Sequence, residues 1–319
     1  MDKKVFEVGK WKINHLREAE YLSSALIAEL QKFLNKEWLP AVCRFPSENP
    51  KARWVGLDDF GIPSPIIRVE MSPLPGKVKN RIFSIGKRPG LLGTLAMVAR
   101  QFPEHRKLIT DGLSGYSFDG FIQIGNFVQD DKLVAEKILQ LPYHNEIPQN
   151  TKGGHYWVRV DPHGGYAQEY LEKLDSISLV PVRSDGCNSE FMALGMAERL
   201  SEMSHYLPWG ESFVVKPVQG TWGENVLIHH LDDSVKTRIA VKEEIHALIH
   251  KMGPEHLMFQ PYIPDRAVIR DEESYHEIWR LYFVCNKGRY EFTGGMVHGS
   301  RLRKVCGIDN TYVIPIFTH

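Results

Sequence analysis

The 319-residue chain lacks several signals that would place it in a well-known class. It has no Walker A sequence and no Gly-x-Gly-x-x-Gly, which disfavours the P-loop and Rossmann nucleotide folds. It has no run of about 18 consecutive apolar residues and no apolar signal core near its start, which predicts a cytoplasmic protein without a membrane partner. Lys plus Arg and Asp plus Glu both number 39. This balance argues against nucleic acid as a partner, because excess basic charge supplies most of that affinity.

Cysteine is scarce as well. The four cysteines are Cys43, Cys187, Cys285 and Cys306, and no two of them form a Cys-x-x-Cys pair. Cys285 and Cys306 lie in apolar, strand-like runs, so we expect buried, reduced thiols there. This pattern is typical of a reducing compartment.

Hydrophobic residues make up 43% of the chain, enough for a large core divided between two or three lobes. Apolar residues recur at helical spacing over 16–34, which predicts an amphipathic helix near the start. Further helices are expected over 91–102 and 188–206, and a strand pair over 118–128. Residues 140–154 are expected to form a loop or lobe boundary.

The most informative stretch is SFVVKPVQGTWGENVLIH, residues 212–229. An apolar strand ends in Lys216, a loop with Gly220 and Gly223 follows, and a second apolar run completes a β-hairpin. The glycines allow backbone N–H groups to approach phosphate oxygens closely, and Lys216 adds a compact positive charge. This pattern indicates nucleotide binding; the alternative is an ordinary hairpin with a solvated lysine.

The elements expected after this hairpin are a helix over 241–251, a strand ending in 258–264 and a third strand over 277–284. This order resembles the ATP-grasp superfamily, the ATP-dependent carboxylate-amine and carboxylate-thiol ligases. The resemblance covers 187–316. It implies an α/β (α+β) fold with an N-terminal α/β lobe over 1–186, of a pre-ATP-grasp type and possible substrate-binding role. An ATP-grasp-like nucleotide-binding region over 187–319 would follow it.

The resemblance also implies how ATP would be held. Lys216 matches the strand lysine that contacts the phosphates, and the loop that follows it would cover them. The linker between the two ATP-grasp subdomains, near 258–264, would hold adenine through backbone groups. The residues implied for the cofactor are Lys216, Gln219, Gly220, Thr221, Trp222, Gly223, Gln260, Pro261, Tyr262 and Ile263.

Arg280 is the first catalytic candidate. It shares a strand face with Ile278 and Tyr282 and therefore needs an anionic partner, either a bound phosphate or a structural carboxylate such as Glu277 or Glu291. In the family an acidic residue stands two positions before the arginine, whereas Glu277 stands three before Arg280. This departure puts the metal role of Glu277 in doubt more than the role of Arg280.

Arg301 is the second catalytic candidate. With Arg303 and Lys304 it forms a basic cluster beyond the glycines Gly294 and Gly295, where it would contact the γ-phosphate or the substrate carboxylate. The alternative is a solvated, charged hairpin end.

Magnesium is implied by the resemblance, but the family's usual acidic metal-binding strand is not apparent after Arg301. Asp309 and Asn310 are residue types that suit an oxygen-ligated cation, although such a pair before a strand also makes a turn. A second candidate is Glu70 in IRVEMSPLPG, residues 67–76. Its Glu-x-Ser-Pro resembles the family's Glu-x-Asn-x-Pro-Gly end and would require a permuted topology.

Two functions follow from these expectations. The first is an ADP-forming ligase, in which ATP and Mg²⁺ activate a small-molecule or peptide carboxylate as an acyl phosphate. An amine or similar nucleophile would then displace the phosphate. The alternative is an inactive nucleotide-binding or protein-interaction module that keeps the ATP-grasp shape.

Overall fold

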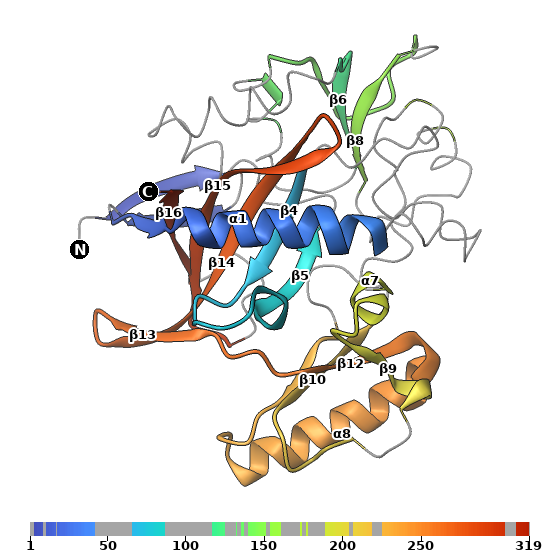
Figure 1. The fold of residues 1–319 in the computed structure, drawn as a ribbon, viewed down its shortest axis with the longest axis vertical. Helices are drawn as coiled ribbons and strands as arrows, with labels where there is room; N and C mark the ends of the chain where they lie inside the picture. The colour runs from blue at the N-terminus through green and yellow to red at the C-terminus, as the bar shows by residue number, and fades with distance from the viewer. Residues whose placement is uncertain are drawn as a thin grey trace.

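The fold is taken from a computed structural model. It describes residues 3–8, 11–16, 18–41, 66–86, 117–124, 132, 135–136, 140–150, 154–160, 173, 177, 189–203, 207–218, 225–303 and 311–318. These residues form a mixed α+β structure (Figure 1).

The described strands are β1 (Lys3–Val8), β2 (Trp11–Leu16), β3 (Glu20–Leu22), β4 (Ile66–Met71), β5 (Ile82–Gly86), β6 (Gly120–Ile124), β7 (Tyr143–His144), β8 (Tyr156–Val160), β9 (Glu198–Arg199), β10 (Phe213–Pro217), β11 (Leu227–His229), β12 (Leu257–Pro261), β13 (Arg266–Arg270), β14 (Glu273–Asn286), β15 (Arg289–Ser300) and β16 (Thr311–Thr318). The described α-helices are α1 (Ser24–Phe33), α7 (Ser189–Ala193) and α8 (Val235–Met252), with a π-helical turn at Leu34–Trp38 and 3₁₀ turns at Val78–Arg81, Leu200–Glu202 and Pro254–His256.

The largest sheet has nine strands and joins residues from both ends of the chain. Its main path is β1-β2-β16-β15-β14-β4-β5, with β13 paired to β14 and β3 paired to β16. The strand β4 therefore lies beside β14, although the two are far apart in sequence. The boundary expected between 186 and 187 does not separate these strands, because both belong to one sheet.

Two tight hairpins set the register at the centre of this sheet. The turn Lys287–Gly288 joins β14 to β15, and both of its residues have positive φ angles, 49° and 75°. The turn Asp271–Glu272 joins β13 to β14 with φ angles of 49° and 67°. Positive φ at both central residues matches the right-handed twist of the strands, which is why two-residue loops are sufficient here.

One face of the large sheet packs on α1. Alternate residues of β14, namely Trp279, Leu281, Phe283 and Cys285, enter the main hydrophobic core, as do Ile67, Val69 and Met71 of β4. The helix lies across this face (Figure 1) and contributes Ile27, Leu30 and Phe33 to the same core. The intervening residues of each strand point to the other face, because side chains alternate along a strand.

The helix α1 begins later than the spacing of apolar residues predicts. Residues up to Leu16 belong to β2, and Glu20–Leu22 form β3. Ser23 caps the helix by accepting a hydrogen bond from the Leu26 amide at 3.2 Å. The prediction of a helix from residue 16 is wrong at its start, because strand pairing with β16 takes those residues and a capping serine fixes the first turn.

A second sheet, of order β11-β10-β12-β9, packs on α8 and forms the lower lobe of Figure 1. Phe213, Val215 and Leu257 face the helix residues Ile245 and Leu248. Ser234 caps α8 by accepting from the Thr237 amide at 3.1 Å. The strand–strand–helix–strand order expected after residue 212 is confirmed, as is the antiparallel pairing of β10 with β11. The helix begins at Val235, earlier than the expected start at 241, and β12 pairs with β10, which was not predicted.

Two other predictions need correction. The helix expected over 188–206 is only the short α7, followed by β9 and a 3₁₀ turn. The strand pair expected over 118–128 is, in its described part, the single strand β6, which pairs in parallel with β7 and β8. The helix expected over 91–102 lies outside the described residues.

Candidate functional site

The second face of the large sheet carries charged and polar side chains in the middle of its strands. In β14 this face presents His276, Ile278, Arg280 and Tyr282, at alternate positions. Residues directly opposite in an antiparallel pair share a face. The register places Glu70 of β4 opposite Arg280, and His298 of β15 opposite Ile278.

Glu70 is the centre of this polar face. One of its oxygens lies 2.9 Å from an Arg68 Nη2 and 3.0 Å from Arg280 Nε, and the other accepts a hydrogen bond of 2.9 Å from the Ser84 hydroxyl. The contact with Arg280 satisfies the distance of an ion pair but not the alignment of a hydrogen bond. Arg280 is buried, with a side chain 5% exposed, so its charge depends on anionic neighbours.

The protonation of Glu70 reflects these surroundings. Burial raises its pKa, whereas positive neighbours and the hydroxyl group lower it; these are Arg68, Arg280, Ser84 and Lys216. The lowering effects prevail, so the pKa of Glu70 lies below its ordinary value of 4.5. The carboxylate is therefore charged at neutral pH.

Lys216 comes to this region from the other lobe. Phe213 and Val215 of β10 face α8, so Lys216 points the other way, toward the large sheet. Its Nζ donates to the Phe83 carbonyl of β5 at 3.1 Å and lies 5.4 Å from the centre of the Phe191 ring. Lys216 is thus buried where the two sheets meet, and it is near enough to Glu70 to lower the pKa of that carboxyl.

Gln260 of β12 supports the same junction. Its side-chain amide donates a long hydrogen bond of 3.4 Å to the Ile82 carbonyl of β5. The linker after Gln260 was expected to hold adenine through its backbone groups. One of these groups is already bonded, because the Tyr262 amide donates to the Ser212 carbonyl at 3.1 Å. Burial, followed by the negative charge of Asp265, raises the pKa of the Tyr262 hydroxyl to about 12. Pro261 is exposed and Ile263 is half-buried.

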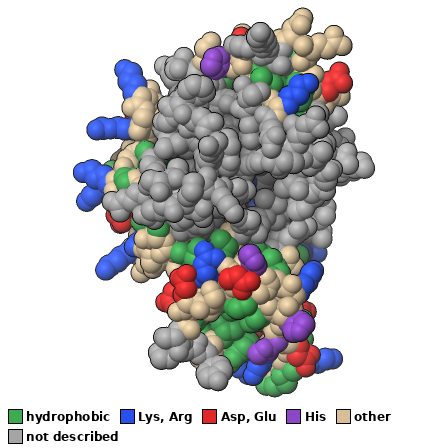
Figure 2. Space-filling model, turned by 90° about the vertical axis from the view of Figure 1, so that its right-hand side faces the viewer, with side chains coloured by type: hydrophobic (Ala, Val, Ile, Leu, Met, Phe, Trp, Pro, Cys, Tyr) green, Lys and Arg blue, Asp and Glu red, His purple; other side chains and the backbone are tan. Residues whose placement is uncertain are grey.

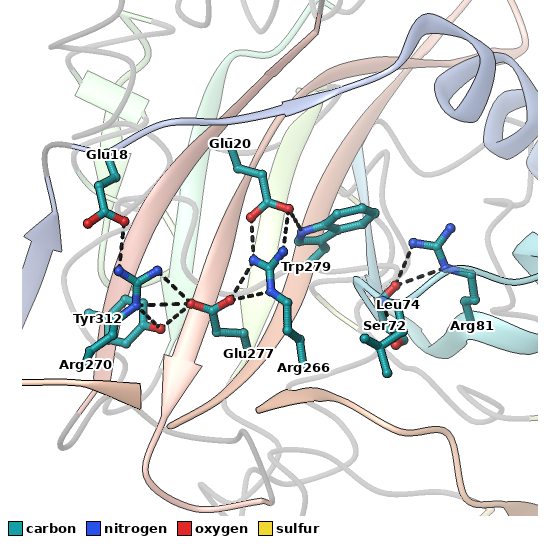
Figure 3. A network of polar contacts seen from close by, with 10 residues as sticks. All are labelled: Glu18, Glu20, Ser72, Leu74, Arg81, Arg266, Arg270, Glu277, Trp279 and Tyr312. Atoms are coloured by element: carbon teal, nitrogen blue, oxygen red, sulfur yellow. Dashed lines mark hydrogen bonds and ion pairs between the residues drawn. The ribbon is translucent and has the colours of Figure 1, made fainter. Parts of the chain in front are cut away.

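Glu277 lies on the opposite face from Arg280, and Figure 3 shows the polar network around it. The polar groups around its fully buried carboxylate are Arg266 at 2.6 Å, Arg270 at 3.1 Å and the Tyr312 hydroxyl, which donates to it. Arg266 also bonds Glu20, and Arg270 also bonds Glu18. Glu277 therefore links side chains of β3 and β13 within the sheet, and the structure does not bring it to Arg280, where its metal role was expected.

A glycine makes this network possible. Gly299 of β15 lies opposite Tyr312 of β16, and a Cβ on Gly299 would overlap the Tyr312 ring. The ring occupies that space and reaches Glu277, and burial together with the Glu277 bond raises the pKa of the Tyr312 hydroxyl well above its ordinary value. The glycine in this strand thus serves packing rather than ligand approach at this position.

The structure does not bring Arg301 to Arg280. Arg301 is exposed and pairs with Glu273, and its guanidinium lies 5.9 Å from the centre of the Tyr275 ring. Glu273 is seven residues from Arg280 along β14, a separation of roughly 23 Å in a strand. Arg303 pairs with Asp233 at 2.7 Å. Both described arginines of the expected basic cluster are thus paired with carboxylates, and Lys304 lies outside the described residues.

Several predicted site residues lie outside the described part of the chain. These are Gln219, Gly220, Thr221, Trp222 and Gly223 of the phosphate loop, and Asp309 and Asn310 of the metal site. Their roles stay predictions.

Three residues of the polar face were absent from the predicted site: Arg68, Ser84 and His298. A signal for the first was present in the sequence, because IIRVEM alternates charged and apolar residues in a strand whose apolar positions indicate burial. His298 is 1% exposed, and neither of its ring nitrogens has a hydrogen-bond partner among the described residues. Its sequence context, GGMVHGS, gave no such signal.

The polar face offers one carboxylate that could bind Mg²⁺. Among the described residues, no group of three or more His, Cys, Asp and Glu side chains is close enough to hold a metal ion. Mg²⁺ in nucleotide sites is commonly held by one or two carboxylates plus phosphate oxygens. Glu70 fits as one such carboxylate on the face that carries Arg280, and the cation would then compete with the two arginines for it.

No known protein-family model matches this chain, and no curated protein matches it. Function is therefore inferred from the geometry of the site. Among the residues that the structure describes, no helix combines the length and apolar character needed to cross a bilayer. On the visible surface of the lower lobe, acidic, basic and histidine side chains are intermixed, so no patch of one sign covers it (Figure 2).

Proposed function

We propose that the chain binds ATP at the junction of the two sheets and uses it as an ATP-grasp-type, ADP-forming ligase of the cytoplasm. The observation that carries this proposal is the convergence of Lys216, Glu70 and Arg280. They come from β10, β4 and β14, and Glu70 lies within electrostatic reach of both cations. Buried charges are expensive to assemble, so a cluster drawn from three distant segments favours a site over incidental packing.

The chemistry assigned to these residues is charge stabilisation. Lys216 and Arg280 would offset negative charge on the phosphates, and they are held in place by the backbone of β5 and by Glu70. Glu70 would hold one Mg²⁺ ion, which supplies further positive charge to the phosphate oxygens when bound. The carboxylate substrate and the amine or similar nucleophile would meet the γ-phosphate on the same face.

The position of Glu70 supports the permuted arrangement of the family's elements. Its strand is supplied from upstream in the sequence, yet it lies directly beside the Arg280 strand. An acidic strand next to the arginine strand is what the metal site requires, wherever in the chain that strand is encoded.

A thermal-shift titration with ATP and ADP, with and without magnesium, tests the binding step. A ligand that binds only the folded state raises stability by about 2.7 kcal/mol at a hundred times its dissociation constant. We expect a rise in Tm for the wild type and a much smaller rise for Lys216→Ala. Lys251→Ala, an exposed lysine at the end of α8, is the matched control and should respond like the wild type.

ADP release separates the ligase from the second candidate, a module that binds nucleotide without turnover. The wild type is incubated with Mg-ATP and mixtures of carboxylates and amines. Release that depends on both mixtures supports the ligase, and a Tm response without release supports the module. The absence of any Tm response to millimolar nucleotide would contradict both.

A further inference from the structure

The buried imidazole of His298 makes no hydrogen bond to the residues that the structure describes. Both of its ring nitrogens are without a hydrogen-bond partner there. A buried donor and acceptor that are left without partners destabilise a protein, so each such group in a native fold requires an explanation. A bound ligand is one that can be tested.

The strand register places His298 beside the charged cluster. His298 is opposite Ile278, and Arg280 is opposite Met296, so His298 and Arg280 are diagonal neighbours on one face. Diagonal pairs are separated by about 7–8 Å, within the reach of long side chains. The imidazole and the guanidinium can therefore contact the same small group above the sheet.

The electrostatic surroundings select the chemistry of that group. Burial lowers the pKa of His298 well below its ordinary value of 6.5, and the charges of Arg280 and Arg68 lower it further. The neutral ring offers one N–H donor. A ligand that accepts this hydrogen bond next to two guanidinium groups is an oxyanion, either a phosphoryl group or a carboxylate.

We propose that His298 and Arg280, together with the nearby Arg68, form an oxyanion-binding subsite. In this subsite the neutral imidazole of His298 donates a hydrogen bond to the oxyanion. The proposal rests on the proposed function only in naming the source of the oxyanion, which is the phosphate of the nucleotide or the carboxylate to be activated. Oxyanion binding itself is measured without nucleotide.

The direct test is NMR of the full chain with isotope-labelled histidine. The His298 ring signals, assigned by their loss in His298→Leu, are followed during titration with inorganic phosphate and, separately, with acetate. A response to phosphate assigns the subsite to the nucleotide, and a response to acetate assigns it to the substrate carboxylate. If neither anion moves the His298 signals, the proposal is wrong.

Affinity measurements on variants separate binding from packing. His298→Leu removes the donor but keeps an apolar side chain, so it should weaken binding of the responding anion by about tenfold or more. The Tm of this ligand-free variant should be unchanged or higher, because an unpaired imidazole has been removed. His298→Gln keeps an N–H donor and should retain part of the affinity. His250→Leu, at an exposed position on α8, is the control and should bind like the wild type.

The two proposals fail in different ways. If ATP raises the Tm of the wild type and of His298→Leu equally, and neither phosphate nor acetate moves the His298 signals, the nucleotide site stands and the His298 subsite is refuted. If phosphate moves the His298 signals but ATP produces no Tm response, the subsite stands and the ligase proposal fails.

Discussion

Buried charged side chains have different surroundings on the two faces of the large sheet. On the α1 face, the fully buried carboxylate of Glu277 is enclosed by two arginines and a tyrosine, and those arginines reach further glutamates. On the opposite face, charges stand in the middle of the strands beside a histidine whose ring nitrogens have no partner in the described chain. A closed network stabilises the fold, whereas an open one leaves hydrogen-bonding capacity for a ligand.

This difference is informative because the two carboxylates look alike in sequence. Glu70 and Glu277 are both in strands otherwise rich in apolar residues. Only the partners differ, and the partners predict opposite responses to substitution. Changes on the α1 face should affect folding, and changes on the second face should affect ligand binding more.

The largest effect is expected from Glu277→Gln. Neutralising this carboxylate leaves Arg266 and Arg270 near each other with less compensation, and breaking a buried pair costs roughly 3–5 kcal/mol. Urea unfolding of the variant and of the wild type measures the loss. Glu291→Gln, on an exposed position of β15, should cost less than about 0.5 kcal/mol. A loss below 1 kcal/mol for Glu277→Gln would show that the network contributes little.

Gly299→Ala should have the next largest effect on stability. The added methyl group overlaps the Tyr312 ring, which must move away from Glu277, and overpacking of this kind typically costs about 1–3 kcal/mol. The same unfolding measurement applies. Gly210→Ala is the control, because a Cβ at that position meets no atom within 4 Å. Equal stability of the two variants would contradict the packing described for Tyr312.

The substitution Arg280→Lys tests the role of the opposite face of the sheet in ligand binding. The substitution keeps the charge but loses the planar, bidentate geometry of the guanidinium. We expect ATP-dependent turnover to fall about tenfold or more, with a stability loss within about 1.5 kcal/mol, measured by ADP release and urea unfolding. Arg289→Lys, at an exposed position at the start of β15, should change neither. A dominant loss of stability in Arg280→Lys would assign this arginine to folding instead.

The smallest effect is a pH dependence at Glu70. Its pKa is lower in the folded state than the ordinary 4.5, so the ionised group stabilises the fold above that pH. This contribution is lost as the pH falls below 4.5 through the folded-state pKa. Each unit of lowering corresponds to about 1.4 kcal/mol. The wild type and Glu70→Gln should therefore converge in stability as the pH falls from 5 toward about 3, as measured by Tm, and parallel curves would contradict the shift.

The lobe around Lys216 could be predicted from sequence because its signals are local. A lysine at the end of an apolar run, a following apolar run and a helical segment after them indicate β10, β11 and α8 without distant contacts, although α8 begins six residues before the expected start at 241. Arg280 was also predicted to share a face with Ile278 and Tyr282 and to need an anion, and the alternation along β14 agrees. The spacing of three between Glu277 and Arg280 also indicated that their side chains differ in direction, and the two lie on opposite faces.

The partner of Arg280 could not be predicted. The sequence suggested Glu277 or Glu291, which are close by in the chain, but the carboxylate that pairs with Arg280 is Glu70. Pairing of β4 with β14 depends on which strand edge is free after the whole sheet has assembled, and no local pattern encodes that choice. The same holds for the start of α1, where pairing of β3 with β16 overrides a helical spacing of apolar residues.

The position of β4 between β5 and β14 has a consequence for how the protein is made. About 200 residues separate the end of β4 from the start of β14. At ordinary rates of synthesis the ribosome needs roughly 10–40 s to deliver that length. During this time one edge of β4 has no native neighbour and presents unpaired backbone groups, a template for aggregation. We therefore expect the chain to depend on chaperones during synthesis and to refold slowly, at a rate limited by long-range strand pairing.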